Sequence, residues 1–340
     1  MLAKESEAPD GVLEDEQPPC LLCGAKVVTL IHKIQDNRLG VPGTYSISRC
    51  SFCNFEQIYP RPEPDQLKQL YEEYYNFAGE KGTTYTKLRQ RLFDSSLYRL
   101  WLALDGDGSF HGRKGSGRLL DIGCNEGRGL KIYRQNGFIP EGLELNAKAA
   151  DVARSAGFKV YEQLLHDFQP RTFYDVVVLS NVLEHSLDPK RMLLDISRIL
   201  RPGGQVWISC PNSGSWIRKI CGHAWINWHV PFHISHFSEP TLRMVLTESG
   251  FVDVKISQVT PALWVASSLI AAVFSRKGRA TRELRNPALV LALMTLARTV
   301  LCPLMIAGNL TRHGDCLIAC ASRSDDVGAS NLGGFSDARN

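Results

Sequence analysis

Two pairs of cysteines near the amino terminus have the spacing of metal ligands. Cys20 and Cys23 form one Cys-x-x-Cys pair, and Cys50 and Cys53 form a second. Four thiolates in this pattern close a tetrahedral Zn²⁺ site without an open coordination position, which favours a structural role over a catalytic one. A redox-active pair is less consistent with the sequence, because no thioredoxin-like context surrounds either motif.

A glycine-rich turn farther along the chain has the form of a cofactor-binding loop. In the segment LLDIGCNEG, Gly123 and Gly127 permit a tight turn and a close approach of a ligand to the backbone. Asp121 lies at the carboxyl end of a predicted strand, where open α/β sheets bind ligands. Glu144 ends the next predicted strand, from which a carboxylate can accept hydrogen bonds from ribose hydroxyls. Asn125 interrupts the G-x-G-x-x-G pattern of dinucleotide sites, so this turn alone identifies no cofactor.

A folded domain must hold these residues in place, and the order and lengths of the apolar runs predict its architecture. From Arg118 onward, strand-length apolar runs alternate with helix-length segments, which indicates βαβ units and a mainly parallel sheet. The predicted strands are RLLDIG, PEGLEL, KVYE, YDVVVLSN and GQVWISCPN, followed by VDVKISQV and DCLIACASR. A helix should begin near Arg128 after the glycine-rich turn, and Ser238 should cap another.

The sequence divides into five parts. Residues 1–18 and 324–340 are predicted to be disordered tails. Residues 19–60 form the cysteine module, and residues 61–117 a helical linker or cap that ends in a Gly-rich stretch. Residues 118–323 form the α/β domain.

With these motifs in place, residues 118–323 resemble the class I S-adenosylmethionine-dependent methyltransferases. LLDIGCNEG corresponds to their first motif, FYDVVVLSNVLEH to the segment around the fourth strand, and LRPGG to the turn before the fifth. The resemblance implies a Rossmann-like seven-stranded sheet whose last strand, DCLIACASR, is antiparallel. It also implies that S-adenosylmethionine is bound by Asp121, Gly123, Asn125, Gly127, Glu144, Asp167 and Asn181. Asn125 stands where the family often has glycine, and Asp167 is equally consistent with a surface loop acid.

The cysteine module and a histidine-rich segment narrow the range of molecules that could accept the methyl group. A zinc module joined to this domain resembles a bacterial methyltransferase group associated with saccharide modification, and WHVPFHISHFS is similar to a segment of that group. Placed after the fifth strand, its histidines would lie over the cofactor, so we expect His233, then His236, to act as the base, with His185 beside them. Two alternatives remain open: a cluster that only shapes the pocket, and a metal site that joins Glu184 to His185, His233 and His236.

Residues 260–314 form an apolar insertion before the last strand. TPALWVASSLIAAVFS and NPALVLALMTLARTVLCPLMIAGNLT flank the basic linker RKGRATRELR. The first run is shorter than the roughly 20 residues that cross a bilayer, and the second contains Arg298 and Pro303. The insertion is predicted to be a helical lid or dimer face, or alternatively a peripheral membrane contact made by apolar helices and Lys/Arg side chains.

The amino-acid composition limits which classes of protein remain possible. The 340 residues are 44% hydrophobic and 22% charged, which excludes a mainly disordered, collagen-like or coiled-coil chain. A formal charge of +4, from 39 basic and 35 acidic residues, disfavours a dedicated nucleic-acid binder. The polar amino terminus carries no secretory signal, so we expect a cytosolic protein with reduced cysteines. Its other thiols should be buried: Cys124, Cys210, Cys221, Cys302, Cys316 and Cys320.

Together these features predict a cytosolic, zinc-containing methyltransferase that acts at oxygen on a small molecule or saccharide, with an unknown oligomeric state. Two rivals remain. An RNA methyltransferase would use the cysteine module and the basic linker to bind phosphates. A non-catalytic scaffold would bind S-adenosylmethionine without transferring its methyl group.

Overall fold

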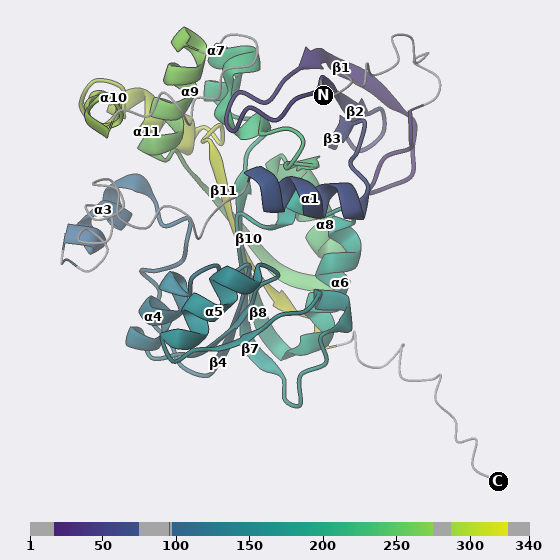
Figure 1. The fold of residues 1–340 in the computed structure, drawn as a ribbon, viewed down its shortest axis with the longest axis vertical. Helices are drawn as coiled ribbons and strands as arrows, with labels where there is room; N and C mark the ends of the chain where they lie inside the picture. The colour runs from purple at the N-terminus through teal and green to yellow at the C-terminus, as the bar shows by residue number, and fades with distance from the viewer. Residues whose placement is uncertain (1–16, 75–94, 96, 275–286, 326–340) are drawn as a thin grey trace, which may run out of the picture.

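The computed structural model describes residues 17–74, 95, 97–274 and 287–325, which form two β-sheets surrounded by helices (Figure 1). The larger sheet has seven strands in the order β10-β11-β8-β7-β4-β5-β6. Its neighbouring strands are parallel, except that β11 is antiparallel to both β8 and β10. This order and the one reversed strand confirm the predicted Rossmann-like seven-stranded sheet.

The seven strands lie where the apolar runs predict them. They are β4 (Arg118–Ile122), β5 (Ile139–Leu143), β6 (Lys159–Tyr161), β7 (Tyr174–Ser180), β8 (Leu200–Pro211), β10 (Phe251–Val259) and β11 (Cys316–Arg323). The predicted turn at LRPGG is wrong, because these residues belong to β8, although α6 (Pro189–Ile199) does end directly before them with Leu200 as its C-cap. Leu200 pairs with Tyr174 on β7, and regular pairing resumes only at Gln205, so the Pro-Gly-Gly stretch is accommodated as an irregularity within the strand.

Alternate positions along the strands give the large sheet two buried faces, as the period of a β-strand requires. Leu119 belongs to the apolar cluster on one face, and its neighbour Leu120 belongs to the cluster on the other. Figure 1 shows which helices cover each face. They are α4 (Arg128–Gln135) and α5 (Ala147–Ser155) on one side, and α6 (Pro189–Ile199) and α8 (Glu239–Glu248) on the other.

The amino-terminal module is a four-stranded antiparallel sheet. Three of its strands are consecutive: β1 (Val27–Ile34), β2 (Tyr45–Cys50) and β3 (Glu56–Tyr59). The fourth, β9 (Ser235–His236), comes from the α/β domain and pairs with β3. The rings of Phe55 and Phe237 lie 5.3 Å apart between centroids, and both belong to the core of the large sheet. The two sheets therefore share one continuous apolar core.

The predicted helical linker contains α1 (Pro64–Tyr74) and α3 (Leu97–Asp105) among the described residues. The Gly-rich stretch that follows α3 contacts the carboxyl edge of the large sheet, since the hydroxyl of Ser180 donates to the Gly108 carbonyl at 3.2 Å. Most of both predicted tails, and the part of the linker between α1 and α3, lie outside the described residues.

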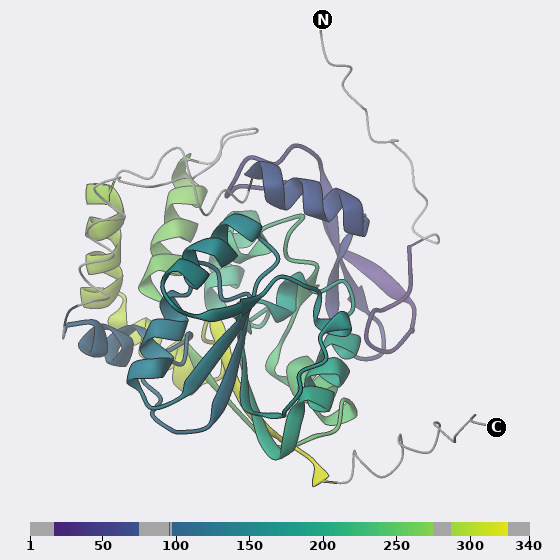
Figure 2. The same cartoon turned by 60° about the horizontal axis from the view of Figure 1, so that its bottom comes forward.

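The apolar insertion is helical where it is described. Its helices are α9 (Ala262–Phe274), α10 (Pro287–Thr299) and α11 (Cys302–Leu310), and α9 and α10 lie side by side (Figure 2). The basic linker RKGRATRELR lies outside the described residues. Among the described helices, none alone has the length and apolar composition of a membrane span. Ala288–Thr299 and Cys302–Leu310, bent by 63°, satisfy those limits only as a pair.

Candidate functional site

The carboxyl ends of β4, β5 and β7 meet at one edge of the large sheet, where the predicted cofactor residues gather. Asp121 is buried in β4, between Gly142 on β5 and Val178 on β7. Burial raises the pKa of Asp121 to about 8, and the negative charge of the nearby Glu144 adds to this shift. The carboxyl group is therefore largely protonated at neutral pH in the free protein, and an approaching cation would ionise it.

The backbone of the glycine-rich turn permits a ligand to approach it closely. Gly123 is exposed with a φ of +71°, and its N–H donates to the Leu143 carbonyl at 2.7 Å. A Cβ built at Gly123 would lie 3.0 Å from Val182, and one built at Gly127 would lie 2.8 Å from the Cβ of Ala153. Both positions combine a left-handed backbone with close packing, which only glycine satisfies without strain.

Glu144 organises the same turn. Its Oε2 accepts a hydrogen bond from the N–H of Asn125 at 2.9 Å, and its Oε1 accepts one from the N–H of Asn146 at 2.8 Å. Asn125 has a φ of +51°, a conformation that asparagine adopts more readily than most residues with a side chain. Asparagine in place of the family's glycine therefore preserves the turn.

The two remaining predicted cofactor residues are exposed. Asn181 directly follows β7 with a φ of +54°, and its N–H donates to the Ser209 carbonyl at 2.9 Å. It precedes Val182, the residue that packs against Gly123, so it belongs to the same edge. Asp167 ends the short helix η2 (Leu165–Asp167), and its carboxylate lies 3.4 Å from Nε2 of His166. A cofactor contact by Asp167 stays a prediction.

Two further side chains lie at this edge, Tyr98 and His111, and neither is among the site residues predicted from the sequence. The Tyr98 hydroxyl lies 2.6 Å from Nδ1 of His111. A Cβ built at Gly129 would lie 3.0 Å from Oδ2 of Asp121 and 3.3 Å from Nε2 of His111, so the imidazole flanks the acid. Burial lowers the pKa of His111 to about 4, which keeps its ring neutral. A lone histidine within an otherwise polar, Gly-rich stretch is the signal that was available.

A second group of polar side chains is buried just beyond β7. Glu184 and His185 lie in the short helix η3 (Leu183–His185), and His233 lies before β9. One ligating atom of each lies within 4.8 Å of the others. The carboxylate of Glu184 is buried, and neither of its oxygens has a hydrogen-bond partner among the described residues. Burial raises its pKa to about 8. A buried acid without a partner is costly, so this cluster is suited to receive a proton or a cation.

The two imidazoles of this cluster are oriented through Nδ1. Nδ1 of His233 lies 2.7 Å from the Asn227 carbonyl. Nδ1 of His185 lies 3.0 Å from the Phe232 carbonyl and 2.8 Å from the Tyr71 hydroxyl. An Nδ1–H group that donates to a carbonyl leaves Nε2 with its lone pair, as in histidines that bind metals or accept protons. Burial lowers the pKa of both rings, to about 4 for His185.

His236 is placed less directly. Its ring centroid lies 6.5 Å from that of His233 and 5.1 Å from that of Trp228, and its buried Nε2 has no partner among the described residues. Burial and the positive charge of Arg218 lower its pKa to about 3. The structure thus brings together Glu184, His185 and His233 from the predicted metal set, whereas His236 lies outside that group.

The four predicted zinc ligands converge at one end of the amino-terminal sheet. The Sγ atoms are 3.6 Å apart for Cys20 and Cys53, 3.4 Å for Cys23 and Cys50, and 3.5 Å for Cys23 and Cys53. A tetrahedral site with Zn–S bonds of about 2.3 Å separates its sulfurs by about 3.8 Å. The cluster therefore needs only small shifts to hold such an ion.

The other cysteines follow the prediction only in part. Cys124, Cys210 and Cys316 are buried, as expected. The prediction is wrong for Cys221, Cys302 and Cys320, which are partly exposed. Cys221 is the last residue of α7 (Trp216–Cys221) and Cys302 is the first of α11, and side chains at helix ends border solvent.

Comparison with known families agrees with this geometry. Residues 85–256, half of the chain, match the family model described as a methyltransferase domain. The chain belongs to this family. Its strand order and its glycine-rich turn are those of a class I S-adenosylmethionine-dependent methyltransferase domain. The methyltransferase domain supplies the sheet edge and the Glu184 cluster, whereas the cysteine module lies outside the matched residues.

Relatives of the methyltransferase domain are distant. The ubiquinone biosynthesis O-methyltransferase of Erwinia tasmaniensis is 31% identical over 141 residues, 38% of this chain and 56% of that protein. That of Klebsiella pneumoniae is 30% identical over 143 residues, 39% of this chain and 57% of that protein. The chain thus spans about half the length of the curated relatives it matches. Among solved structures, Haemonchus contortus phosphoethanolamine N-methyltransferase 2 is 14% identical, with a TM-score of 0.47 over 88% of this chain and 69% of that one.

Proposed function

We propose that the protein transfers the methyl group of S-adenosylmethionine to a hydroxyl group of a small-molecule or saccharide acceptor. The observation that carries the proposal is Glu184, which has no hydrogen-bond partner within the described part of the chain. It clusters with His185 and His233 directly beyond the edge that holds Asp121 and Glu144. Methylation at oxygen is supported by the names of the curated relatives, which are O-methyltransferases. A saccharide acceptor is supported by the resemblance of the cysteine module and histidine segment to a saccharide-associated group.

The residues at the sheet edge fit the cofactor. Glu144 would accept hydrogen bonds from ribose hydroxyls, the exposed left-handed Gly123 would let the backbone approach, and Asp121 would face a cationic group. When bound, S-adenosylmethionine supplies a methyl group that its sulfonium makes electrophilic. The chain must hold the acceptor oxygen in line with that methyl group and must remove the hydroxyl proton.

We propose that His233 is the base that removes the proton from the acceptor hydroxyl. Its Nδ1–H donates to the Asn227 carbonyl, so Nε2 is the accepting atom. The imidazolium that forms would favour ionisation of the adjacent Glu184, whose carboxylate would then stabilise it. His185 positions Glu184 and His233 from the same cluster, and His236 is the second candidate for the base. The three clustered atoms also fit a divalent cation, since one carboxylate and two imidazoles are a common ligand set.

Methyl transfer into fractionated cell extract tests this function. The purified protein, supplied with methyl-labelled S-adenosylmethionine, should label the glycan or lipid fraction of an extract of the source cells. Glu184→Gln and His233→Asn should abolish that label while cofactor binding is retained. Label confined to RNA would overturn the acceptor class. Cofactor binding without any label would indicate the non-catalytic scaffold. Elemental analysis of both variants separates a histidine base from a bound cation, because only a cation would be lost with its ligands.

We propose that the Cys20, Cys23, Cys50 and Cys53 cluster holds one structural zinc ion. The four sulfurs lie within 4.8 Å of one another, and three of their separations are 3.4 to 3.6 Å, so together they would leave no coordination position for a substrate. The purified protein should contain about one zinc per chain by this assignment. A zinc-free protein with an unchanged unfolding temperature would contradict it.

A cytosolic protein that rests on a membrane surface is the localisation we propose. Large apolar side chains on α10 and α11 are exposed to solvent: Leu296 at 42% on the first of these helices, and Leu304 at 56% and Leu310 at 79% on the second. Such a face suits the boundary between lipid headgroups and acyl chains. The protein should float with vesicles that contain anionic lipid, and Leu304→Lys with Leu310→Lys should prevent this. Flotation that is unchanged in this variant would indicate that the face is a lid or dimer surface instead.

A further inference from the structure

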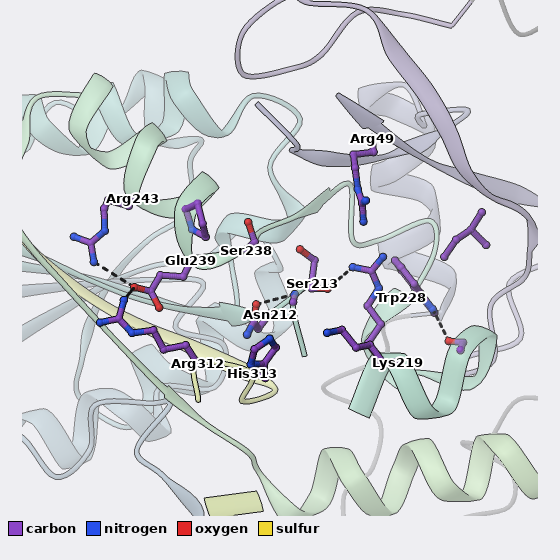
Figure 3. Close-up of a pocket in the computed structure, with 15 residues that line it drawn as sticks. Arg49, Asn212, Ser213, Lys219, Trp228, Ser238, Glu239, Arg243, Arg312 and His313 are labelled. Atoms are coloured by element: carbon purple, nitrogen blue, oxygen red, sulfur yellow. Dashed lines mark hydrogen bonds and ion pairs between the residues drawn. The ribbon is translucent and has the colours of Figure 1, made fainter. Parts of the chain in front are cut away.

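A cavity of about 750 Å³ lies between the amino-terminal sheet and the methyltransferase domain (Figure 3). Its walls come from β1 and β2, from the segment after β8 with α7, from the start of α8 and from the residues before β11. None of the predicted cofactor residues lines it. Its cationic side chains are Arg49, Arg218, Lys219, Arg243 and Arg312. Glu239 is the one acidic residue among the described residues that line it.

The positive charges of this cavity exceed the acids beside them. Arg49 and Arg218 share the buried carboxylate of Glu56, at 2.7 Å and 2.9 Å. In the same way, Arg243 and Arg312 share Glu239, at 3.4 Å and 3.1 Å. Four guanidinium groups thus face two carboxylates.

Lys219 adds a fifth positive charge, and its exposed side chain forms no ion pair with the described residues. Each shared guanidinium also retains N–H groups that its acid does not occupy. Like charges gathered in one concave site repel one another, and an anion placed between them would remove that repulsion.

We propose that this cavity binds the phosphate or diphosphate group of a small organic molecule. Guanidinium groups hold phosphate oxygens through paired N–H donors, which explains the use of arginine. Glu239, the first residue of α8, adds its N–H group and the positive end of a helix, whereas the N–H of Ser238 donates to Thr241. The volume falls in the range of about 300–1,000 Å³ that is typical of small-molecule sites and is too large for phosphate alone. Ile31, Trp228 and Pro240 supply apolar wall for the remainder of the ligand.

The cavity is distinct from the cofactor edge but adjoins the histidine cluster. Trp228 contacts both, since the guanidinium carbon of Arg218 lies 4.6 Å and the ring centroid of His236 lies 5.1 Å from the centroid of its ring. Glu56, which pairs with Arg218, is also the strand partner of His236 in the β3–β9 pair. A ligand at Arg218 would therefore lie one ring away from the groups assigned to proton transfer, although its binding does not depend on methyl transfer.

Calorimetric titration with inorganic pyrophosphate and with uridine 5′-diphosphate tests the proposal. The wild-type protein should bind both probes, and uridine without phosphate should not bind. Lys219→Ala with Arg312→Ala removes two charges from exposed positions, so the fold should be retained and the dissociation constant should rise about tenfold or more. Lys148→Ala with Arg171→Ala is the matched control, because it removes two exposed charges away from the cavity and should change binding less than about twofold.

Three results would overturn the proposal. They are no heat of binding for either probe, equal loss in the cavity variant and the control, and tight binding of single-stranded RNA that neither probe displaces. Cofactor binding measured on the same samples keeps this test independent of the proposed methyl transfer. A loss of that binding in the cavity variant would reveal misfolding, in which case the single variant Lys219→Ala decides the outcome.

Discussion

The cysteine cluster and the Glu184 cluster both gather metal-ligating side chains, yet they do so in opposite ways. The four sulfurs come from two knuckles of one small sheet and complete a coordination shell by themselves. Glu184, His185 and His233 come from segments on either side of β8, offer three atoms and leave a position open. A closed shell supports folding, whereas an open one leaves room for chemistry. Metal-ligating side chains are therefore suited to stability in the cysteine cluster and to reaction in the Glu184 cluster.

Removal of one thiolate should give the largest effect on stability. Cys50→Ser replaces a buried thiolate with a hydroxyl, which is a poor zinc ligand, so the amino-terminal sheet should lose its metal. We expect zinc content to fall to near zero and the free energy of unfolding to fall by several kcal/mol. Elemental analysis and thermal unfolding measure both. Cys302→Ser, outside the cluster, is the control and should leave both values unchanged. If Cys50→Ser retained its zinc, the four cysteines would not form a closed shell, and the contrast with the Glu184 cluster would fail.

The open cluster should respond in activity rather than in stability. Glu184→Gln keeps the shape of the side chain but removes its ability to ionise, so kcat should fall by about 10² to 10⁴. The unfolding temperature should be equal to or higher than that of the wild type, because the carboxylate has no partner among the described residues. Glu162→Gln, on the surface, should behave like the wild type. Full activity in Glu184→Gln would show that this cluster only shapes the pocket.

Asp315 accepts hydrogen bonds from Trp225 and Asn227, just before the histidines, and its ionisation should make stability depend on pH. Burial raises the pKa of Asp315 to about 6, although hydrogen bonds from Ser215 and Trp225 oppose the shift. Between about pH 4 and 6, the folded protein keeps a proton that the unfolded chain has lost, so this group reduces stability as the pH rises. The wild type should lose about 3 kcal/mol relative to Asp315→Asn across that interval. Denaturant titrations of both proteins at several pH values measure the difference. A constant difference would mean that Asp315 is already ionised at pH 4.

The cofactor edge should give the smallest effects. Glu144→Ala removes the acceptor for ribose hydroxyls and for the N–H of Asn125, so the dissociation constant of S-adenosylmethionine should rise about tenfold. Asp167→Asn alters an exposed acid beside His166 and should change that constant less than about threefold. Calorimetric titration compares the two directly. A larger effect for Asp167→Asn would place the adenine against η2.

Much of the fold follows from the sequence because it depends on local signals. The strand runs, the glycine-rich turn and the start of α4 at Arg128 need only hydrophobic period and residue type. The strand β9 was beyond prediction, since two residues carry no period and their partner β3 lies far away in the chain. The site divides in the same way. The motif Glu184-His185 is visible in the sequence. That the Glu184 carboxylate has no hydrogen-bond partner among the described residues, and that His111 approaches Asp121, depends on tertiary packing.

The β3–β9 pair makes the predicted border after residue 60 a poor place to divide the protein. Ser235 and His236 hydrogen-bond to the amino-terminal sheet, and His233 lies two residues before that strand. A fragment that begins at Arg118 would keep every strand of the large sheet but would lose the strand that pairs with its own histidine segment. The small module thus completes the structure of the α/β domain, and we expect the two parts to fold as one unit.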